Sequence, residues 1–373
     1  MTKLLPLLAV SVLLAHISQQ NTENCAAMGR AYYKRKDMAY TLLVVILILF
    51  SGLRTSYNDT LNYINGFGRA ETLDVLLSKS EWRNPFTNPL FHLYQSALKT
   101  WSGDPQMLIF TSAAFTQICF MSFLKRYSEN FTFSVFVYIT LGTFVFTLAA
   151  IKQVLAMAML TLAFPHLQRR NWIRYYLIVW LAMLLHTYAL AFAVLPLFQT
   201  RPWKAFTFAF LAMLVVVMLN FEGAITAFME QANDLGKSLA DYEVFDDATI
   251  NVFRLAVYAV TPAISFAFRR RALYDNSRMD NVLVHMSIIS LAIMILGTQS
   301  GANMFGRMSN YFELGTICCL PNMLRKTFDN RSYKMITSMA CICFIGFFVY
   351  ANAVKIDFDQ HYRAMGLFQF LFS

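Results

Sequence analysis

Residues 38–59 read MAYTLLVVILILFSGLRTSYND, and this stretch sets the pattern for the whole chain. An apolar run ends abruptly at Arg54, and Asp59 follows shortly after it. Such a run predicts a membrane helix, because a transmembrane helix needs about 20 mostly apolar residues. A charge at the bilayer centre costs on the order of 3 kcal/mol, so charges that end apolar runs anchor headgroups, line polar cavities or carry function.

The composition places the chain among polytopic membrane proteins. Of its 373 residues, 57% are hydrophobic and only 14% are charged, whereas about a quarter of the residues are charged in a typical soluble domain. The sequence contains no long polar block, internal repeat or low-complexity tract. We therefore predict an all-α, polytopic integral membrane protein with a single membrane domain over residues 1–373.

Apolar length predicts about 11–12 transmembrane helices, some of them short, tilted or half-spanning. The candidate segments are 3–18, 38–53, 105–124, 131–150, 152–167, 172–200, 204–220, 251–268, 281–298, 308–323 and 333–351. A cleaved signal peptide is the alternative interpretation of the first segment, which follows Lys3. Cleavage would leave the basic run Arg30–Lys36 outside, and this disfavours the alternative.

The net charge of +10 comes from basic residues in short loops rather than from one face that would bind nucleic acid. Loops rich in Lys and Arg are typical of the cytoplasmic side of a membrane, so the charge orients the protein. The basic clusters are Arg30–Lys36, Lys125 with Arg126, Arg169–Arg174, Arg269–Arg271 and Arg325–Lys334.

If each predicted segment crosses the membrane once, the basic loops in the second half of the chain do not fall on the cytoplasmic side. If 172–200 crossed only once, Arg269–Arg271 would fall outside. An extra crossing repairs the count, and we place it around His186 and Thr187, where two half-length helices would meet near the outer face. The segment Gly301–Asn310 then also lies outside.

The same topology makes residues 54–104 and 221–250 extracytoplasmic loops. Each is predicted to carry an interfacial helix. In the first loop this helix covers Pro89–Trp101. In the second, Phe221, Ile225, Phe228 and Met229 share one helical face, and this helix either forms a lid over the site or simply lies at the interface.

On this topology, the polar residues at the ends of apolar runs share the outer side of the membrane. They are Arg54, Asp59, Lys152, Gln153, His186, Arg307 and Tyr311. Each has a simpler explanation when taken alone: cations anchor helix ends, an acid solvates a loop, a histidine is satisfied in the interior, and a tyrosine joins an interfacial belt. Their shared side favours one outward-facing cavity.

Four short motifs resemble those of EpsG-type, Wzy-like exopolysaccharide polymerases. Ser51-Gly52-Leu53-Arg54, followed by Asp59-Thr60 and Tyr63, resembles the family's GLR…DT..Y signature. Ile151-Lys152-Gln153-Val154-Leu155-Ala156 resembles its RQ.(I/L)A helix start. Leu181–His186 resembles the LA..FH element, and Arg307–Phe312 resembles the R.(S/A)(N/Y)YF element. The motifs occur in family order across roughly residues 40–350, which is nearly the whole chain.

The chain departs from the family pattern at two places. Lys152 stands where the family usually has Arg, which keeps the positive charge but loses the planar fork that suits phosphate. Thr187 and Tyr188 follow His186, where a small residue is more usual. These departures concern the detailed role of the Lys152 and His186 sites.

The resemblance implies a GT-C-like glycosyltransferase in a bacterial cytoplasmic (inner) membrane. It would join polyprenyl-pyrophosphate-linked oligosaccharide repeat units at the outer face. Arg54, Lys152 and Arg307 would stabilise the pyrophosphate leaving group. His186 is the first candidate for the base and Asp59 the second. Gln153, Tyr63 and Tyr311 complete the expected substrate-binding set.

The expected partners are the lipid-linked oligosaccharides and membrane lipids, together with a chain-length regulator and a flippase. The sequence contains neither a P-loop nor a GxGxxG motif, which fits a lipid-linked donor. The loop acids lack EF-hand spacing, and Cys341 with Cys343 has neither CxxC spacing nor His partners. We therefore expect no metal ion or cofactor.

Two other classes of function stay open. A flippase or transporter of lipid-linked oligosaccharide would also gather cations in a membrane cavity, although transporters often carry internal repeats. A membrane acyltransferase that modifies polysaccharide would need a nucleophile or a histidine beside an acid, and the sequence has no HxxxD-like pair.

Overall fold

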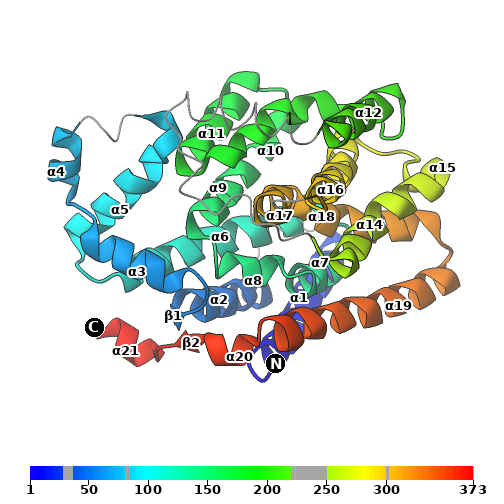
Figure 1. Cartoon of the computed structure of the whole chain (residues 1–373). Coiled ribbons are helices and arrows are strands. Elements are labelled where there is room, and N and C mark those ends of the chain that lie inside the picture. Colours follow the sequence, from blue (N-terminus) through cyan, green and yellow to red (C-terminus); the bar gives the residue numbers. More distant parts are fainter. Residues whose placement is uncertain (28–36, 80–83, 221–222, 224–249, 300–301, 373) are drawn as a thin grey trace. The chain divides into compact units, whose positions relative to one another are not determined.

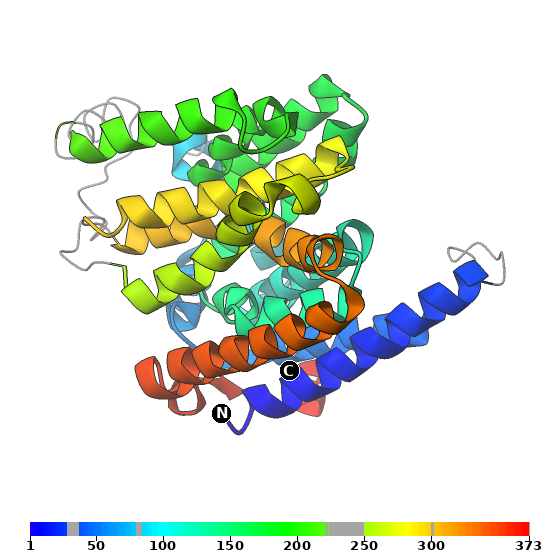
Figure 2. The ribbon, with the colours of Figure 1, turned by 90° about the vertical axis from the view of Figure 1, so that its right-hand side faces the viewer.

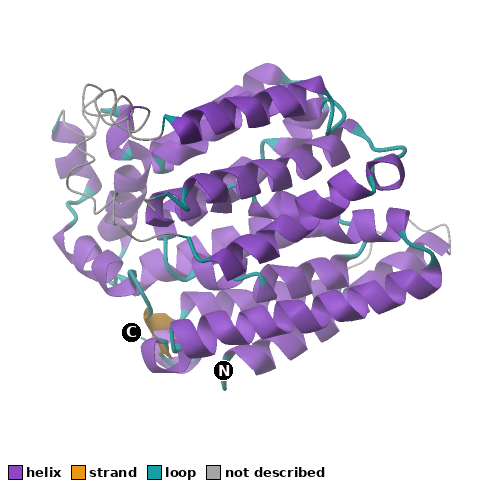
Figure 3. Ribbon diagram, turned by 45° about the vertical axis from the view of Figure 1, so that its right-hand side comes forward, coloured by secondary structure: helices purple, strands orange, loops and turns teal. Residues whose placement is uncertain are grey.

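The computed structural model describes residues 1–27, 37–79, 84–220, 223, 250–299 and 302–372. These residues are helical almost throughout, apart from loops and one short two-stranded ladder (Figure 3). The contacts divide the chain into two compact units. The first comprises Met1–Trp82, Leu90–Leu162 and Met339–Ser373, and the second comprises Arg83–Pro89 and Ala163–Ser338.

The first unit combines the N-terminal helices with the end of the chain. Its elements are α1 (Leu4–Ala27), α2 (Met38–Gly52), β1 (Arg54–Ser56), α3 (Thr60–Arg69), α4 (Leu73–Ser78), α5 (Pro89–Trp101), α6 (Gln106–Tyr127), α7 (Phe131–Thr140), α8 (Thr143–Thr147) and α9 (Ile151–Thr161), followed by the second half of α19 (Asn330–Val349), the π-helix η5 (Tyr350–Lys355), α20 (Phe358–His361), β2 (Arg363–Ala364) and α21 (Leu367–Leu371).

A close approach of α2 and α6 builds the core of this unit. A Cβ atom added at Gly52 would lie 2.8 Å from Phe110 Cδ2 and 3.3 Å from Phe110 Cα, so only glycine leaves room for α6 there. The approach brings the start of α6 to the end of α2, where Gln106 Nε2 donates hydrogen bonds to the carbonyls of Gly52 (2.6 Å) and Arg54 (3.1 Å).

The helix ends of the first unit gather into two groups. At one end Lys125 Nζ lies 3.5 Å from Asp37 Oδ2 and donates to Ser18 Oγ at 2.6 Å, which joins α6, α2 and α1. We name the other group the Arg54 end. It holds Arg54, the start of α6 and the C-terminal strand β2 (Figure 1). The basic residues in the last turn of α6, Lys125 and Arg126, therefore lie at the opposite end of this helix from the carbonyl of Arg54.

The second unit contains the shorter helices of the middle of the chain. Its elements are η3 (Pro85–Thr87), α10 (Phe164–Gln168), α11 (Trp172–Leu185), the 3₁₀ helix η4 (Thr187–Gln199), α12 (Ala205–Leu219), α14 (Val252–Ala267), α15 (Arg269–Ala272), α16 (Arg278–Leu296), α17 (Ala302–Asn310), α18 (Glu313–Thr327) and the first half of α19.

Helix α16 is the centre of the second unit and is buried along nearly its whole length. Figure 2 shows it between α12 and α14. On another side α18 packs against it at Gly315, where an added Cβ atom would meet Met286 and the carbonyl of Leu283. This packing carries the junction of α17 and α18, which holds Tyr311.

The helix break predicted at His186 is confirmed. Helix α11 ends at Leu185, His186 is extended (φ −157°, ψ 120°), and η4 begins at Thr187. Tyr175 Oη donates to the carbonyl of Phe192 at 2.6 Å, so the two helices fold back on each other as a hairpin. Each is too short to cross a bilayer at 1.5–2 Å per residue.

Three other predicted segments are divided where the sequence indicated continuous helices. Segment 131–150 is interrupted at Gly142, which adopts φ 99°. Segment 152–167 forms α9 and α10, and segment 308–323 falls across α17 and α18. Apolar length does not detect these breaks, because a one- or two-residue turn leaves the hydrophobic pattern intact.

Among the described residues, four helices are long and apolar enough to cross a membrane: Leu4–Glu23, Gln106–Tyr127, Arg278–Leu296 and Asn330–Lys355. Six shorter apolar helices accompany them: α2, α7, α11, η4, α12 and α14. The predicted helix at Pro89–Trp101 is present as α5. The predicted helix at Phe221–Met229, most of the loop 221–250 and the basic run Arg30–Lys36 lie outside the described residues.

Candidate active site

Hydrogen bonds from the C-terminal segment and from α6 hold the backbone around Arg54 in place. Strand β1 pairs antiparallel with β2, so that Arg54 lies opposite Ala364. Met365 N donates to the carbonyl of Leu53 at 2.9 Å, and Gln106 holds the carbonyl of Arg54 itself. The guanidinium donates from Nε to Thr60 Oγ1 at 3.2 Å and from Nη1 to the carbonyl of Ser51.

The Arg54 side chain is a buried cation that forms no ion pair with a described residue. It is 1% exposed, and no carboxylate of a described residue lies within 4.0 Å of its nitrogens. Burial lowers the pKa of Arg54 to about 10, an effect that Tyr362 and Tyr63 oppose. The side chain therefore stays charged at neutral pH. A buried ion costs several kcal/mol unless a partner offsets it, so this position favours an anion.

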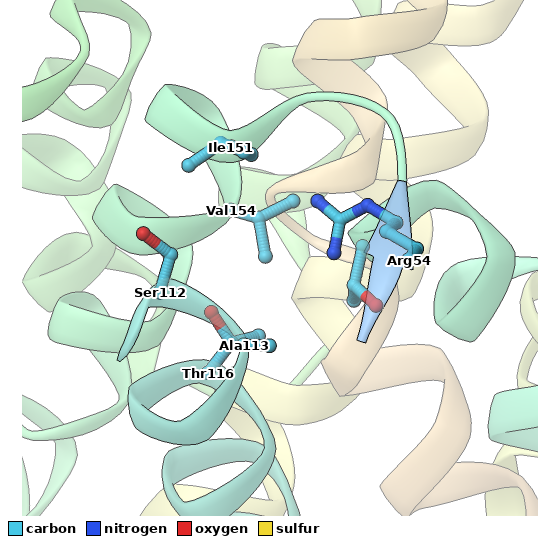
Figure 4. A pocket seen from close by; sticks show the side chains of 7 residues that line it. Arg54, Ser112, Ala113, Thr116, Ile151 and Val154 are labelled. Atoms are coloured by element: carbon cyan, nitrogen blue, oxygen red, sulfur yellow. The ribbon is translucent and has the colours of Figure 1, made fainter. Parts of the chain in front are cut away.

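A small cavity lies directly beside Arg54 (Figure 4). The guanidinium points from β1 toward Val154 of α9, and α6 lines the cavity with Ser112, Ala113 and Thr116. Thr147 and Ile151 complete the lining. The space has room for roughly one water molecule. Three hydroxyl-bearing residues and one guanidinium thus line this small space in the first unit, together with apolar side chains.

Lys152 and Gln153 belong to the first turn of α9, whose residues Ile151 and Val154 line the same cavity. The Lys152 backbone N–H donates to Tyr63 Oη at 3.4 Å. The Lys152 ammonium lies 4.9 Å from the centre of the Phe91 ring. Gln153 is 1% exposed. The structure therefore brings Arg54, Tyr63, Lys152 and Gln153 into one region of the first unit.

Asp59 immediately precedes α3, and its side chain makes no capping hydrogen bond to that helix. The Asp59 backbone carbonyl accepts from Tyr63 N at 3.1 Å, which begins the helix that carries Tyr63. The Asp59 side chain is half-buried. Asp59 is next in sequence to Thr60, whose hydroxyl accepts the hydrogen bond from Arg54 Nε.

The second unit joins His186 to Tyr311. The Tyr311 hydroxyl lies 2.8 Å from His186 Nδ1, and the edge of the Tyr188 ring packs against the imidazole with centroids 4.9 Å apart. Tyr311 is 2% exposed. Arg307 lies one turn earlier on α17 and donates from Nε to Asn303 Oδ1 at 2.9 Å. The sequence predicted these residues as members of one site, and the structure places them in one unit.

A buried polar network in the second unit escaped the sequence analysis. Tyr258 of α14 donates to Glu313 of α18, a residue that is 1% exposed. The Arg254 guanidinium lies 5.5 Å from the centre of the Tyr258 ring, and the Asn310 side-chain nitrogen donates to Glu313 Oε1 at 2.6 Å. A usable signal existed, because Arg254 and Glu313 are charges inside predicted membrane segments.

The sequence did not predict a role for the C-terminal segment, since the last predicted helix ended at 351. Tyr362 Oη donates to the carbonyl of Phe50, and Ser56 Oγ donates to the carbonyl of His361 at 3.2 Å. Phe370 stacks on Phe110 with ring centres 4.6 Å apart. These contacts hold the strand that carries Arg54.

A search of the described residues for three or more His, Cys, Asp or Glu side chains that could hold a metal ion finds no such group. The hydrogen-bonding side chains that line the small cavity are cationic or hydroxylic: Arg54, Ser112, Thr116 and Thr147. Such groups bind anions rather than metal cations.

The broken apolar helices are those of a helical membrane protein, and its first unit holds a small cavity beside the buried Arg54. The chain belongs to the EpsG family, whose model matches residues 37–365. The match includes each residue predicted for the site, and it also reaches β2. No curated protein matches the chain significantly, and no solved structure does.

Proposed function

We propose that the protein is a polymerase of bacterial surface polysaccharide. It joins polyprenyl-pyrophosphate-linked oligosaccharide repeat units by glycosyl transfer at the outer face of the cytoplasmic membrane. Membership of the EpsG family supports a polysaccharide polymerase as the general class. The lipid-pyrophosphate donor, the GT-C-like architecture and the outer face are the more specific parts of the proposal.

The observation that carries the proposal is the buried Arg54 guanidinium, which lacks a carboxylate partner among the described residues. A pyrophosphate leaving group develops negative charge as its bond to the sugar breaks. Fixed cations in a site of low dielectric constant stabilise that charge without having to reorganise. Arg54 and Lys152 supply such charges in the first unit, and Arg307 supplies one in the second.

In the proposed reaction, the growing chain is the donor and the next lipid-linked repeat unit is the acceptor. The bond from the anomeric carbon to the pyrophosphate oxygen breaks, and a bond from the same carbon to an acceptor hydroxyl oxygen forms. The hydroxyl proton passes to a base, and the polyprenyl pyrophosphate leaves with the electron pair. The anomeric carbon has oxocarbenium character in between, as in glycoside hydrolysis.

His186 is the first candidate for this base. For Nε2 to accept the proton, Nδ1 must carry hydrogen and donate it to the Tyr311 oxygen, which lies 2.8 Å away. Tyr311 would then fix the required tautomer and ring orientation. Asp59 is the second candidate, and it belongs to the first unit with Arg54.

The two ends of the first unit support the orientation. Lys125 and Arg126 close α6 at one end, while the Arg54 end lies at the start of the same helix. If the basic end faces the cytoplasm, Arg54 faces outward. A polymerase so placed would receive its substrate from a flippase and would work beside a chain-length regulator and among membrane lipids.

The test compares polysaccharide in cells lacking the gene and complemented with wild type, Arg54→Ala or Arg307→Ala at matched membrane levels. We expect long chains only with wild type, and single lipid-linked repeats on the outer surface with either variant. Full-length polymer with Arg54→Ala would refute the assignment of the cation. Single repeats retained inside would indicate a flippase instead.

A further inference from the structure

Helix α5 of the first unit makes direct contact with Lys152. Phe91, on its first turn, is 1% exposed, and the Lys152 ammonium lies 4.9 Å from the centre of its ring. This distance is within the range of a cation–π interaction. No carboxylate of a described residue lies within 4.0 Å of the ammonium. Among the described residues, the contact that the ammonium makes is therefore with an aromatic ring rather than with an acid.

Neighbouring aromatic residues fix the Phe91 ring. Tyr63 packs against it with centroids 6.1 Å apart at 65°, and Tyr94 does so at 6.3 Å and 63°. Tyr63 Oη also accepts from the Lys152 backbone N–H. The ring is thus held by the same tyrosine that contacts the lysine backbone.

The same helix reaches the Arg54 cavity. The Tyr94 hydroxyl lies 2.6 Å from Thr111 Oγ1 and 3.1 Å from Ser112 Oγ, and Ser112 lines the cavity beside Arg54. Helix α5 therefore touches the lysine through Phe91 and the cavity wall through Tyr94. Both contacts lie on the first two turns of the helix.

The choice of an aromatic partner has a chemical consequence. A carboxylate would neutralise the ammonium and compete with any anionic ligand. A ring face attracts the ammonium through its quadrupole but adds no net charge. Lysine beside phenylalanine is therefore held in place and stays available to a phosphate oxygen.

We propose that Phe91 is a positioning residue that holds the Lys152 ammonium for an anionic phosphate group of the lipid-linked substrate. The inference rests on the proposed function and adds to it a role for α5. The ring is compatible with lysine here and with the family's usual arginine, since either cation can lie over an aromatic ring. Lys152→Arg should accordingly keep most of the activity.

The test measures kcat and KM for a lipid-linked repeat unit with the purified full-length protein in vesicles. Phe91→Leu keeps an apolar side chain but removes the ring face, and we expect kcat/KM to fall about tenfold, the equivalent of about 1.4 kcal/mol. Phe91→Trp should retain activity within about threefold, because indole is the best cation–π partner.

Phe67→Leu is the matched control. Phe67 is buried in the same unit, and the Lys99 ammonium lies 5.2 Å from the centre of its ring, so this variant removes a similar pair that has no contact with the cavity. It should leave kcat/KM unchanged. An equal loss in Phe67→Leu and Phe91→Leu would assign the effect to packing and overturn the inference.

A double variant separates failure of this inference from failure of the proposed function. In a Lys152→Gln background, Phe91→Leu should cause no further loss, because the interaction that it removes is already absent. If Lys152→Gln loses activity while Phe91→Leu alone does not, the role of Phe91 is refuted and the polymerase stands. If wild type forms no saccharide bond, the proposed function itself fails.

Discussion

At the scale of single residues, the central feature is the buried charge of Arg54, which has no carboxylate within 4.0 Å among the residues that the structure describes. Thr60 and Ser51 accept two of the Arg54 hydrogen bonds, and neither offsets its charge. The sequence predicted Arg54 as a site residue because it ends an apolar run. It could not predict burial to 1% exposure, because Gln106 and β2 enclose Arg54 from distant parts of the chain.

Arg54→Lys should therefore be strongly impaired, although the charge is kept. The planar guanidinium donates to Thr60 and Ser51 at the same time and has further N–H groups for a ligand. The single ammonium group of lysine cannot reproduce this geometry. We expect kcat/KM to fall at least a hundredfold for a lipid-linked repeat unit, with membrane levels near those of wild type. Activity within threefold of wild type would show that charge alone suffices.

Tyr311→Phe tests the histidine pair. The variant removes the hydroxyl that lies 2.8 Å from His186 Nδ1 and keeps the buried ring. We expect kcat to fall roughly tenfold with little change in KM, because an orienting partner of a base acts mainly on the chemical step. Tyr176→Phe, at a side chain that is 45% exposed, is the control. Equal kcat in the two variants would refute Tyr311 as the residue that orients His186.

At the scale of elements, the strand that carries Arg54 depends on the end of the chain. Met365→Pro removes the N–H that donates to the carbonyl of Leu53 at 2.9 Å, whereas Met365→Ala keeps it. We expect polymer yield to fall several-fold for the proline variant and to stay near wild type for the alanine variant. Similar yields from both would show that this ladder does not support the site.

The break between α7 and α8 gives a prediction about stability. Gly142 has φ 99°, and a Cβ atom added there would meet no other atom within 4 Å, so Gly142→Ala should cost about 1–2 kcal/mol from backbone strain alone. Gly346, in the helical part of α19, is equally open, and Gly346→Ala should be neutral or stabilising. Thermal unfolding of the purified variants measures the difference, and equal shifts would contradict it.

Element positions were predictable to the extent that apolar length determines them. The hairpin at His186 could be inferred because the charge of the following loops required an extra crossing. The turns at Gly142 and between α17 and α18 could not, since local packing decides them. The β1–β2 ladder joins residues 54–56 to 363–364, and no local pattern reveals a pairing across that separation.

At the scale of the whole molecule, the account predicts how the first unit is oriented in the membrane. Asn62→Cys lies at an exposed position of α3, near the Arg54 end, and Glu129→Cys lies at an exposed position beyond the basic end of α6. An impermeant maleimide should label the first variant in intact cells and the second only after permeabilisation. The wild-type chain gives the background from its native cysteines, and the reverse pattern would invert the topology.

The family and the class of fold were predictable from the whole sequence, because short motifs in order and repeated apolar runs extend over most of it. The roles of individual residues were harder to predict from the sequence. Glu313 and Arg254 form a buried network that the motifs do not include, and Phe91 gains meaning only from its position beside Lys152. Such roles depend on three-dimensional neighbours rather than on sequence spacing.

The most direct test of the polymerase is product formation by the purified protein in vesicles that contain only a lipid-linked repeat unit. Wild type should convert it into a ladder of longer saccharides and release polyprenyl pyrophosphate, and Arg54→Ala should form neither product. Movement of the unit between leaflets without a new glycosidic bond, or an unchanged ladder from Arg54→Ala, would contradict the account.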